Sequence, residues 1–344
     1  MEQRFTAGWY REPARPSLLT PLGWLYGALM RARRRAYVSG WVRTERAGKP
    51  VVVIGNLTVG GTGKTPLTIW LARQLIARGL KVGIVSRGYG RRGAAPRTVQ
   101  STCDWRQVGD EPLIIARRTA CATIVAKDRV AGARALVAAG ADVVLADDGL
   151  QHLRLGRDCE IVVIDGARGF GNGRVLPAGP LREPLGRLPQ PDAVVMNGAP
   201  EHGSLAAALR SSPALQMRLV GEEALRLDGQ EPARALHGFA GQRLHAVAGI
   251  GNPARFFSAL RAHGIEVIEH AFADHHRFVP AELAFADGLP VLMTEKDAVK
   301  CLAFADARLW YVPVAAQFGA REAHELLARV LAKVRPTSVA GGQI

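Results

Sequence analysis

The sequence predicts an α/β fold: a P-loop NTPase-like parallel sheet domain, a second and smaller α/β domain, and an N-terminal membrane-associating helix. Three observations support this prediction. Short β-branched runs alternate with helix-like stretches along most of the chain, as in doubly wound sheets. A glycine cluster separates the first run from the stretch that follows it. The alternation weakens between residues 201 and 240 and then resumes, which indicates a second domain.

The 344 residues are enough for two domains. We expect an N-terminal membrane-associating segment over 1–40, a P-loop domain over 41–205, a linker region over 206–243 and a smaller C-terminal α/β domain over 244–335. The predicted strands cover 51–54, 81–86, 122–126, 142–147, 159–165, 193–197, 244–250, 265–272, 289–294 and 309–314, and the predicted helices cover 131–140, 253–264 and 321–334. The last helix is expected to close the second domain. The Gly- and Pro-rich stretch 166–192 is predicted to be a long surface loop.

The N-terminal segment has the pattern of an interfacial anchor. Residues 17–30 are apolar and include Trp24 and Tyr26, and a cluster of arginines follows them. The arginines of this region are Arg31, Arg33, Arg34, Arg35 and Arg43. Because Pro21 and Gly23 interrupt a run that is shorter than the roughly 20 residues needed to cross a bilayer, we expect it to lie on a membrane. The alternative is an ordinary helix packed on the domain, with its arginines in solvent.

The net charge of +15 implies an anionic partner, which could be nucleic acid, a membrane surface or a phosphorylated substrate. The arginines lie next to an apolar aromatic segment and no nucleic-acid-binding module is recognisable, so the distribution favours a membrane and we expect no nucleic acid. Four scattered cysteines without CxxC spacing indicate a reduced compartment and no structural zinc.

Residues 51–65 combine a β-branched run, a glycine-rich turn and Lys-Thr at the start of a helix. Such a turn directs backbone N–H groups at phosphates, the lysine reaches the β- and γ-phosphates, and the threonine hydroxyl binds Mg²⁺. The predicted nucleotide-binding residues are Thr58, Val59, Gly60, Gly61, Thr62, Gly63, Lys64 and Thr65. Thr58 replaces the first glycine of the strict motif, and Val59 stands where some P-loop ATPases have an extra lysine. The alternative is a glycine-rich turn that binds nothing.

Polar residues follow several predicted strands, at the sheet edge where ligands bind in such folds. Asp147 and Asp148 end the strand 142–147 and are candidates, with Thr65, for binding Mg²⁺; a helix N-cap is the alternative. Gln151 and His152 follow them.

Two further loops of the first domain carry candidate residues. After strand 81–86, Tyr89 lies among glycines and the arginines Arg87, Arg91 and Arg92, which suit an anion or are simply solvated. Asp110 precedes Glu111 and Pro112 and is either a helix N-cap or a base that accepts a proton from an alcohol. The residues alone leave both pairs of alternatives open.

The second domain has two polar strand ends. Asp274, His275 and His276 follow strand 265–272, and a histidine facing the cleft could tune a carboxylate of the first domain. The adjacent histidines lack the spacing of a helical zinc site. Thr294, Glu295, Lys296 and Asp297 follow strand 289–294, where a capped helix start with solvated charges is the simpler interpretation.

Taken in order, these motifs resemble the tetraacyldisaccharide 4′-kinase family over nearly the whole chain. The resemblance is carried by "GNLTVGGTGKTP", "SRGYGR", "VGDEP", "DDGLQH", "IVVIDGARGFGNGRVLPAGPLRE", "AGIGNPARFF", "ADHH" and "MTEKDAVKC". It implies two α/β/α domains joined by a short β linker, with a cleft that closes around the nucleotide. It also implies that ATP and Mg²⁺ are required, that Asp110 is the catalytic base assisted by His275, and that Lys64 acts on the transferred phosphoryl group.

The resemblance further implies that Arg87 contacts anionic groups of the substrate, and we assign Tyr89, Gln151 and His152 to the same substrate site. The predicted activity is phosphorylation of the 4′-hydroxyl of a tetraacyl glucosamine disaccharide 1-phosphate in lipid A synthesis, giving lipid IVA. The expected partners are this lipid disaccharide and the anionic cytoplasmic face of the bacterial inner membrane, with no obligate protein partner. A P-loop switch or delivery ATPase acting on a protein at the membrane is the alternative.

Overall fold

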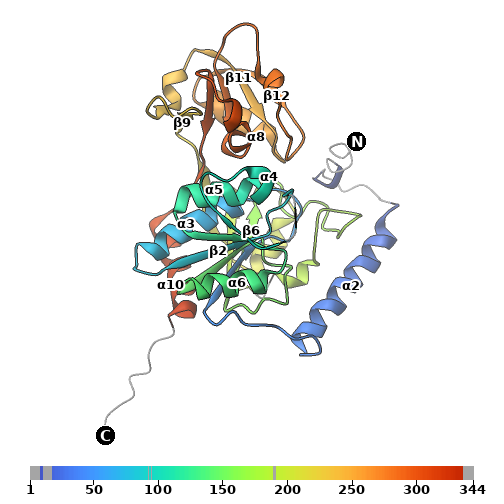
Figure 1. Ribbon diagram of the computed structural model, residues 1–344. Helices are drawn as coiled ribbons and strands as arrows, with labels where there is room; N and C mark the ends of the chain where they lie inside the picture. Colours follow the sequence, from blue (N-terminus) through green and yellow to red (C-terminus); the bar gives the residue numbers. More distant parts are fainter. Residues whose placement is uncertain (1–7, 11–17, 92, 94, 189–190, 336–344) are drawn as a thin grey trace.

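The structure is a computed structural model that describes residues 8–10, 18–91, 93, 95–188 and 191–335, and the statements below concern these residues. Parts of the predicted membrane-associating segment (1–7 and 11–17) and Arg92 of the basic loop lie outside them. The chain forms two α/β units, each built on its own sheet (Figure 1). The element bounds agree with every predicted strand to within a few residues.

The larger unit contains a nine-stranded sheet in the order β15-β8-β7-β6-β1-β5-β2-β4-β3. Its strands are β1 Val51–Gly55, β2 Val82–Ser86, β3 Arg97–Val99, β4 Ala122–Val125, β5 Val143–Asp147, β6 Cys159–Asp165, β7 Ala193–Asn197, β8 Leu215–Val220 and β15 Ala315–Phe318. All pairings are parallel except those of the two edge strands, β3 and β15. The central strands are buried on both faces, which explains their continuous β-branched sequences.

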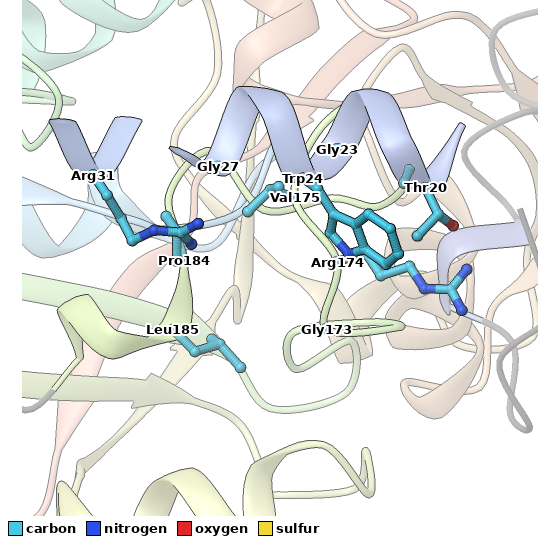
Figure 2. Close-up of a pocket in the computed structure, with 11 residues that line it drawn as sticks. Thr20, Gly23, Trp24, Gly27, Arg31, Gly173, Arg174, Val175, Pro184 and Leu185 are labelled. Carbon is cyan, nitrogen blue, oxygen red and sulfur yellow. The ribbon is translucent and has the colours of Figure 1, made fainter. Parts of the chain in front are cut away.

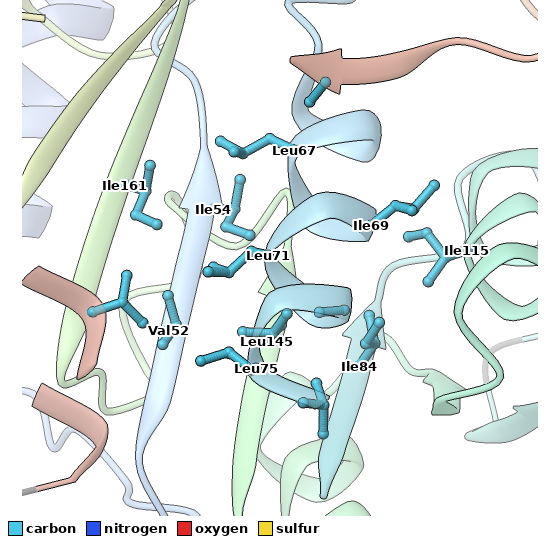
Figure 3. Close-up of a cluster of buried hydrophobic side chains, with 14 of the residues drawn as sticks. Val52, Ile54, Leu67, Ile69, Leu71, Leu75, Ile84, Ile115, Leu145 and Ile161 are labelled. Carbon is cyan, nitrogen blue, oxygen red and sulfur yellow. The ribbon is translucent and has the colours of Figure 1, made fainter. Parts of the chain in front are cut away.

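Helices cover both faces of this sheet. They are α3 Lys64–Ile76, α4 Trp105–Val108, α5 Asp110–Thr119, α6 Arg129–Ala138, α7 Leu205–Ser211 and α10 Ala320–Val334. On one face, α3, α5 and α10 bury Leu67, Leu71 and their neighbours against β1, β2, β5 and β6 (Figure 3). On the other face, α6 and the loop 166–188 pack against the same strands. That loop is irregular, as predicted, but its residues Phe170 and Leu181 are buried, so it is more than a surface loop.

The smaller unit has a six-stranded sheet in the order β10-β9-β14-β13-β11-β12. Its strands are β9 Glu223–Arg226, β10 Arg234–Ala235, β11 Arg243–Ala248, β12 Glu266–Ala271, β13 Val291–Thr294 and β14 Leu309–Val312, and its helices are α8 Pro253–Ala262 and α9 Glu295–Cys301. The 3-10 turns of the chain are η1 Gly8–Tyr10, η2 Leu185–Arg187, η3 Leu236–Phe239, η4 Pro280–Leu283 and η5 Leu302–Phe304.

The C-terminal helix corrects one expectation. The helix over 321–334, predicted to close the second domain, instead packs on the nine-stranded sheet, where Leu326, Leu327 and Val330 join the core around β1 and β6. β15 precedes it and pairs with β8. The helix has an apolar stripe that can cover either sheet, and its sequence does not indicate which one. The predicted linker 206–243 is likewise divided, with β8 in the larger sheet and β9 and β10 in the smaller one.

Helix α2, Thr20–Val38, lies along the side of the larger unit (Figure 1). It touches the domain through Gly23 and Gly27, which face the loop 173–185 (Figure 2). A Cβ at Gly23 would come 3.1 Å from the Ala178 Cβ, so the glycines permit this close approach. Within the described part of the chain, no helix has the length and apolar character needed to cross a bilayer.

Candidate functional site

The P-loop connects β1 to α3 at the carboxyl edge of the larger sheet. Gly60 and Gly63 have φ of 94° and 99°, a left-handed conformation that favours glycine, and Gly63 immediately precedes α3. A Cβ at Gly61 would meet nothing within 4 Å, so this part of the loop is open. The hydroxyl of Thr62 is buried without a hydrogen-bond partner. The loop is therefore held as a concave turn in front of a helix N-terminus, which suits a phosphate.

Lys64 points back across this loop. Its Nζ donates to the Asn56 Oδ1 at 3.2 Å and lies 3.6 Å from the Asp148 Oδ1. Asn56 also donates to the Gly60 carbonyl at 3.3 Å. The amino group thus lies over the P-loop while one carboxylate balances its charge.

The two acidic residues after β5 have different surroundings. The Asp147 Oδ1 accepts from the Thr68 hydroxyl at 3.1 Å, whereas its Oδ2 is buried without a partner. Burial, together with the charges of Glu111 and Asp148, raises the pKa of Asp147 to about 7. Asp148 has φ of 49° and pairs with Arg182 at 3.1 Å. Burial acts to raise the pKa of Asp148, but the cations Lys64 and Arg182 lower it overall. No helix follows the pair, which rules out the N-cap interpretation.

The residues present fit a divalent cation. Thr65 is half-buried in the first turn of α3, and the unpartnered Oδ2 of Asp147 is an available anionic oxygen. Within the described ranges, no three His, Cys, Asp or Glu side chains form a metal site by themselves. None is required, because Mg²⁺ in phosphoryl-transfer sites takes one or two protein carboxylates and completes its shell with phosphates and water.

Arg129 lies next to the acidic pair, and its charge acts on His152. The buried Arg129 donates to the Ala126 carbonyl at 2.8 Å and to the Asp147 carbonyl at 3.4 Å. Burial lowers its pKa to about 10. Burial, assisted by the charge of Arg129, lowers the pKa of His152 to about 4, so its imidazole is neutral at pH 7. From the sequence, we assigned His152 to the substrate site. In the structure, the charged groups that act on its imidazole are Arg129, Asp128, Arg157 and Arg154.

Asp110 is the first residue of α5, preceded by Gly109. Its Oδ1 accepts from the Glu111 backbone N–H at 2.9 Å, and its Oδ2 lies 2.9 Å from the His275 Nδ1. His275 follows β12 in the other unit and has φ of 60°. Burial raises the pKa of Asp110, but the hydrogen bond with His275 and the charge of Lys296 lower it overall. The structure therefore brings together two predicted site residues from different domains.

Lys296 completes this cluster. Its Nζ lies 3.0 Å from the Asp274 Oδ1, 3.2 Å from the His275 Nε2 and 3.5 Å from the Glu111 Oε1. The expected helix cap is present, because the Thr294 side chain accepts from the Asp297 N–H at the start of α9. Lys296 is not solvated, however: only 18% of its side chain is exposed.

The basic loop after β2 lies next to the Asp110–His275 pair. Tyr89 is 65% exposed, and its ring centroid lies 5.0 Å from that of His275. Gly88 is packed against the chain before Asp110, since a Cβ there would come 2.7 Å from the Val108 carbonyl oxygen. Arg87 is exposed at this edge, and Arg91 donates to the Ala95 carbonyl at 2.8 Å. An exposed aromatic and a cation thus flank the pair.

Gln151 links the site to α2. Its Nε2 donates to the Asn56 carbonyl and to the Glu183 carboxylate, both at 3.1 Å. The backbone carbonyl of Gln151 accepts from the Arg33 guanidinium of α2 at 3.1 Å. Tyr26 of α2 donates to the Arg182 carbonyl at 3.1 Å, and Arg182 pairs with Asp148. Arg182 and Asp148 therefore connect the N-terminal helix to Lys64 of the P-loop.

The smaller unit also approaches the P-loop directly. The position of a Cβ on Gly251 would be 3.8 Å from the Gly61 backbone nitrogen. Arg255 of α8 donates to the Asn197 Oδ1 at 3.2 Å, and Asn197 donates to the Thr62 carbonyl at 3.2 Å. Arg168 lies against the other side of the loop, hydrogen-bonded to the Gly61 carbonyl. These contacts place both units around the same glycine-rich turn.

Several of these residues were not predicted individually. Arg168 and Arg182 lie inside the motif at 161–183, and Asn56 lies in the P-loop motif, but neither pattern assigns a contact to a single side chain. Arg255 lies inside the motif at 248–257 and Asn197 ends the predicted strand 193–197, but neither pattern assigned a contact to them, and Arg129 carries no local sequence signal. Lys296 was identified, but as a solvated charge.

Comparisons with known proteins agree on one family. The family profile described as tetraacyldisaccharide-1-P 4′-kinase (LpxK) matches residues 15–334. A protein named tetraacyldisaccharide 4′-kinase from Alkalilimnicola ehrlichii is 52% identical over 315 residues, which are 90% of this chain and 92% of that protein. One of the same name from Pseudomonas paraeruginosa is 51% identical over 338 residues, or 95% and 99% of the two chains.

A solved structure has a similar fold. The crystal structure of LpxK from Aquifex aeolicus in complex with ATP is 27% identical in sequence, with a TM-score of 0.73. The match covers 91% of this chain and 98% of that one. The likeness therefore extends over both α/β units.

Proposed function

The chain belongs to the tetraacyldisaccharide 4′-kinase family, and we propose that the junction between its two domains is where the phosphoryl group is transferred. It is an ATP-dependent kinase that phosphorylates the 4′-hydroxyl of the tetraacyldisaccharide in lipid A synthesis. The assignment of individual residues rests mainly on one observation: the buried Asp110 carboxylate, hydrogen-bonded to the partly exposed His275 imidazole, lies at the same sheet edge as the P-loop.

The P-loop holds the donor. Residues 58–65 surround the phosphates of ATP with backbone N–H groups, and the Lys64 ammonium stabilises charge on the transferred phosphoryl group. Thr65 and one of Asp147 and Asp148 would hold Mg²⁺, with the unpartnered Asp147 Oδ2 as the better candidate. When bound, the ion neutralises phosphate charge and helps to orient the donor.

Asp110 receives the proton. As the 4′-oxygen forms its bond to the γ-phosphorus and the bond to the ADP oxygen breaks, the hydroxyl proton passes to the Asp110 carboxylate. His275 orients that carboxylate through its 2.9 Å hydrogen bond. Arg87 and Tyr89, exposed beside the pair, bind the sugar and its anionic groups, with Gln151 on the side of α2. The half-buried His152, whose imidazole is neutral at pH 7, is next to Gln151 in the sequence and is the remaining residue proposed for this substrate site.

Helix α2 docks the enzyme on the anionic cytoplasmic face of the inner membrane. Its glycine face packs on the domain, and its outer face exposes Leu22, Trp24, Leu25 and Leu29 at 53%, 71%, 69% and 60%. Arginines of the same helix lie near lipid phosphates when these side chains insert. Because Arg33 and Tyr26 contact the Gln151–Arg182 side of the site, the active site lies next to the lipid surface.

A transfer assay tests the residue assignments. Purified enzyme is incubated with γ-labelled ATP, Mg²⁺ and the lipid disaccharide in mixed micelles, and label is measured in the lipid and aqueous fractions. We expect label in the lipid, and a kcat lower by about 10²-fold or more for Asp110→Asn with unchanged ATP affinity. Asp306→Asn, a half-exposed aspartate of the second domain, is the control.

Near-normal turnover of Asp110→Asn would exclude Asp110 as the base. Label released only into water would favour the alternative P-loop switch or delivery ATPase. None of the contacts described above supports that alternative.

A further inference from the structure

His275 is surrounded by groups from four segments. Its Nδ1 faces Asp110 of α5 at 2.9 Å, and its Nε2 faces Lys296 of α9 at 3.2 Å. Tyr89 of the loop after β2 lies against its ring. The adjacent Asp274 accepts from the His275 backbone N–H at 3.0 Å and contacts Lys296 with the same oxygen. Both ring nitrogens therefore have a defined partner.

The chemistry of these partners decides where the imidazole proton resides. An ammonium group has N–H donors and no acceptor, so Lys296 can only donate to Nε2. To accept this hydrogen bond, Nε2 must be unprotonated, so the single ring proton of a neutral imidazole is then on Nδ1. That proton is donated to Asp110. A doubly protonated ring would direct its Nε2–H at another cation.

Lys296 itself stays charged. Burial acts to lower its pKa, but the carboxylates of Glu111, Asp110 and Asp274 raise it overall. For His275, burial and the Lys296 charge act to lower the pKa, but the hydrogen bond with Asp110 raises it overall. Lys296 is thus a permanent positive charge that limits how far Asp110 can raise the basicity of His275.

We propose that Lys296 is a positioning residue that fixes His275 as the neutral Nδ1–H tautomer, leaving Asp110 as the only proton acceptor of the pair. This role rests on the proposed function of Asp110 and His275. A neutral His275 donates one hydrogen bond without the full charge of an imidazolium, so Asp110 stays more basic than it would be beside a cationic ring. The Glu111 contact joins Lys296 to the first domain, so the tautomer is set when the two domains meet.

The tautomer can be measured directly. Two-dimensional ¹H–¹⁵N correlation spectra of the full-length enzyme, labelled in histidine, distinguish Nδ1–H from Nε2–H and from imidazolium at pH 7 to 8. The His275 signals are assigned as those lost in His275→Gln. We expect Nδ1–H in the wild type and in Lys296→Arg, and a loss of this preference in Lys296→Met. An Nε2–H or imidazolium form in the wild type overturns the proposal without any need for a variant.

The pH profile of kcat/KM gives the second readout. Removing the cation raises the pKa of His275, so the acid limb of Lys296→Met should move up by about one pH unit or more, with recovery at high pH. Lys296→Arg should retain the wild-type limb. Lys333→Met, which removes a half-exposed lysine paired with Asp192, is the matched control.

A uniform loss of rate with an unmoved acid limb and an unchanged tautomer would mean that Lys296 is merely structural. Should the wild type fail to transfer label to lipid at all, the proposed function fails. The tautomer spectra still decide the role of Lys296, so the two failures are distinguishable.

Discussion

The Asp110 carboxylate and the His275 imidazole meet across the domain junction, with Oδ2 and Nδ1 2.9 Å apart, although 165 positions separate the two residues in the chain. Each is placed by its own unit: Asp110 by the start of α5, and His275 by the turn after β12. The pair therefore exists only while the two units are together.

This contact predicts strong coupling between the two residues. Asp110→Ala should lower kcat by about 10²-fold or more, and His275→Ala by a smaller factor. Because His275 acts through Asp110, the double variant should be little worse than Asp110→Ala alone. A double-mutant cycle on kcat measures the coupling. Factors that multiply would show that the two side chains act independently.

The raised pKa of Asp147 predicts a pH-dependent gain from Asp147→Asn. The folded pKa of about 7 lies above the ordinary aspartate pKa of 3.8, so the wild type loses stability as pH rises through this interval. The amide cannot ionise and does not incur that loss. In nucleotide-free protein without Mg²⁺, Asp147→Asn should increase the free energy of unfolding more at pH 8 than at pH 5, by an amount on the order of 1 kcal/mol or more, and its gain in Tm should be correspondingly larger at pH 8.

Thermal unfolding followed by circular dichroism at both pH values provides the measurement. A difference in Tm that does not change with pH would show that Asp147 is not protonated near neutrality in the folded enzyme. The same variant should transfer phosphate poorly, because the proposed cation loses an anionic oxygen.

The position of Arg255 predicts that the second domain contributes to ATP binding. Its guanidinium contacts Asn197 and lies 3.7 Å from Asp165, next to the P-loop. Arg255→Ala removes a partly exposed contact, so we expect the KM for ATP to rise by about fivefold or less. Arg261→Ala, on the same helix but paired with Glu269 of its own unit, is the control. Equal effects of the two substitutions would contradict a specific role at the junction.

The exposed leucines of α2 predict that membrane binding depends on the insertion of their side chains. Replacing Leu22, Leu25 and Leu29 by serine removes apolar area that would insert, and should reduce binding to anionic vesicles by at least about 10-fold. The Tm should hardly change, because these side chains are exposed in the folded enzyme. Raising the salt concentration should weaken the remaining arginine-dependent binding.

Co-sedimentation with vesicles measures this partition. Ile76→Ser removes an exposed apolar side chain of α3 and serves as the control. Unchanged binding of the triple variant would refute α2 as the docking element.

The sequence predicted what depends on local pattern. β1 was recognisable because a strand buried on both faces needs a continuous apolar run, and the P-loop because its glycines, Lys64 and Thr65 have a fixed spacing. Asp147 and Asp148 were recognisable because strand ends in parallel sheets face ligands. Each of these signals lies within a few neighbouring residues.

Contacts made by folding were not predictable in the same way. Asp110 could be a cap or a base until α5 was found to start at that residue, with Oδ2 free to meet His275. Lys296 resembles any solvated lysine near a helix start, because Glu111 and Asp274, which surround it, come from distant segments. The predicted placement of α10 was wrong for the same reason, because the sequence of an amphipathic helix does not indicate which sheet its apolar face covers.

The return of the chain to the larger sheet has a consequence for how the enzyme is made. β15 and α10 follow the second domain in the chain, yet they cover the edge of β8 and one face of β1. A nascent chain that stops before residue 315 contains every P-loop residue but leaves β8 open as a template for pairing with other chains. The nine-stranded sheet that carries the P-loop is therefore completed only after the second domain has emerged from the ribosome.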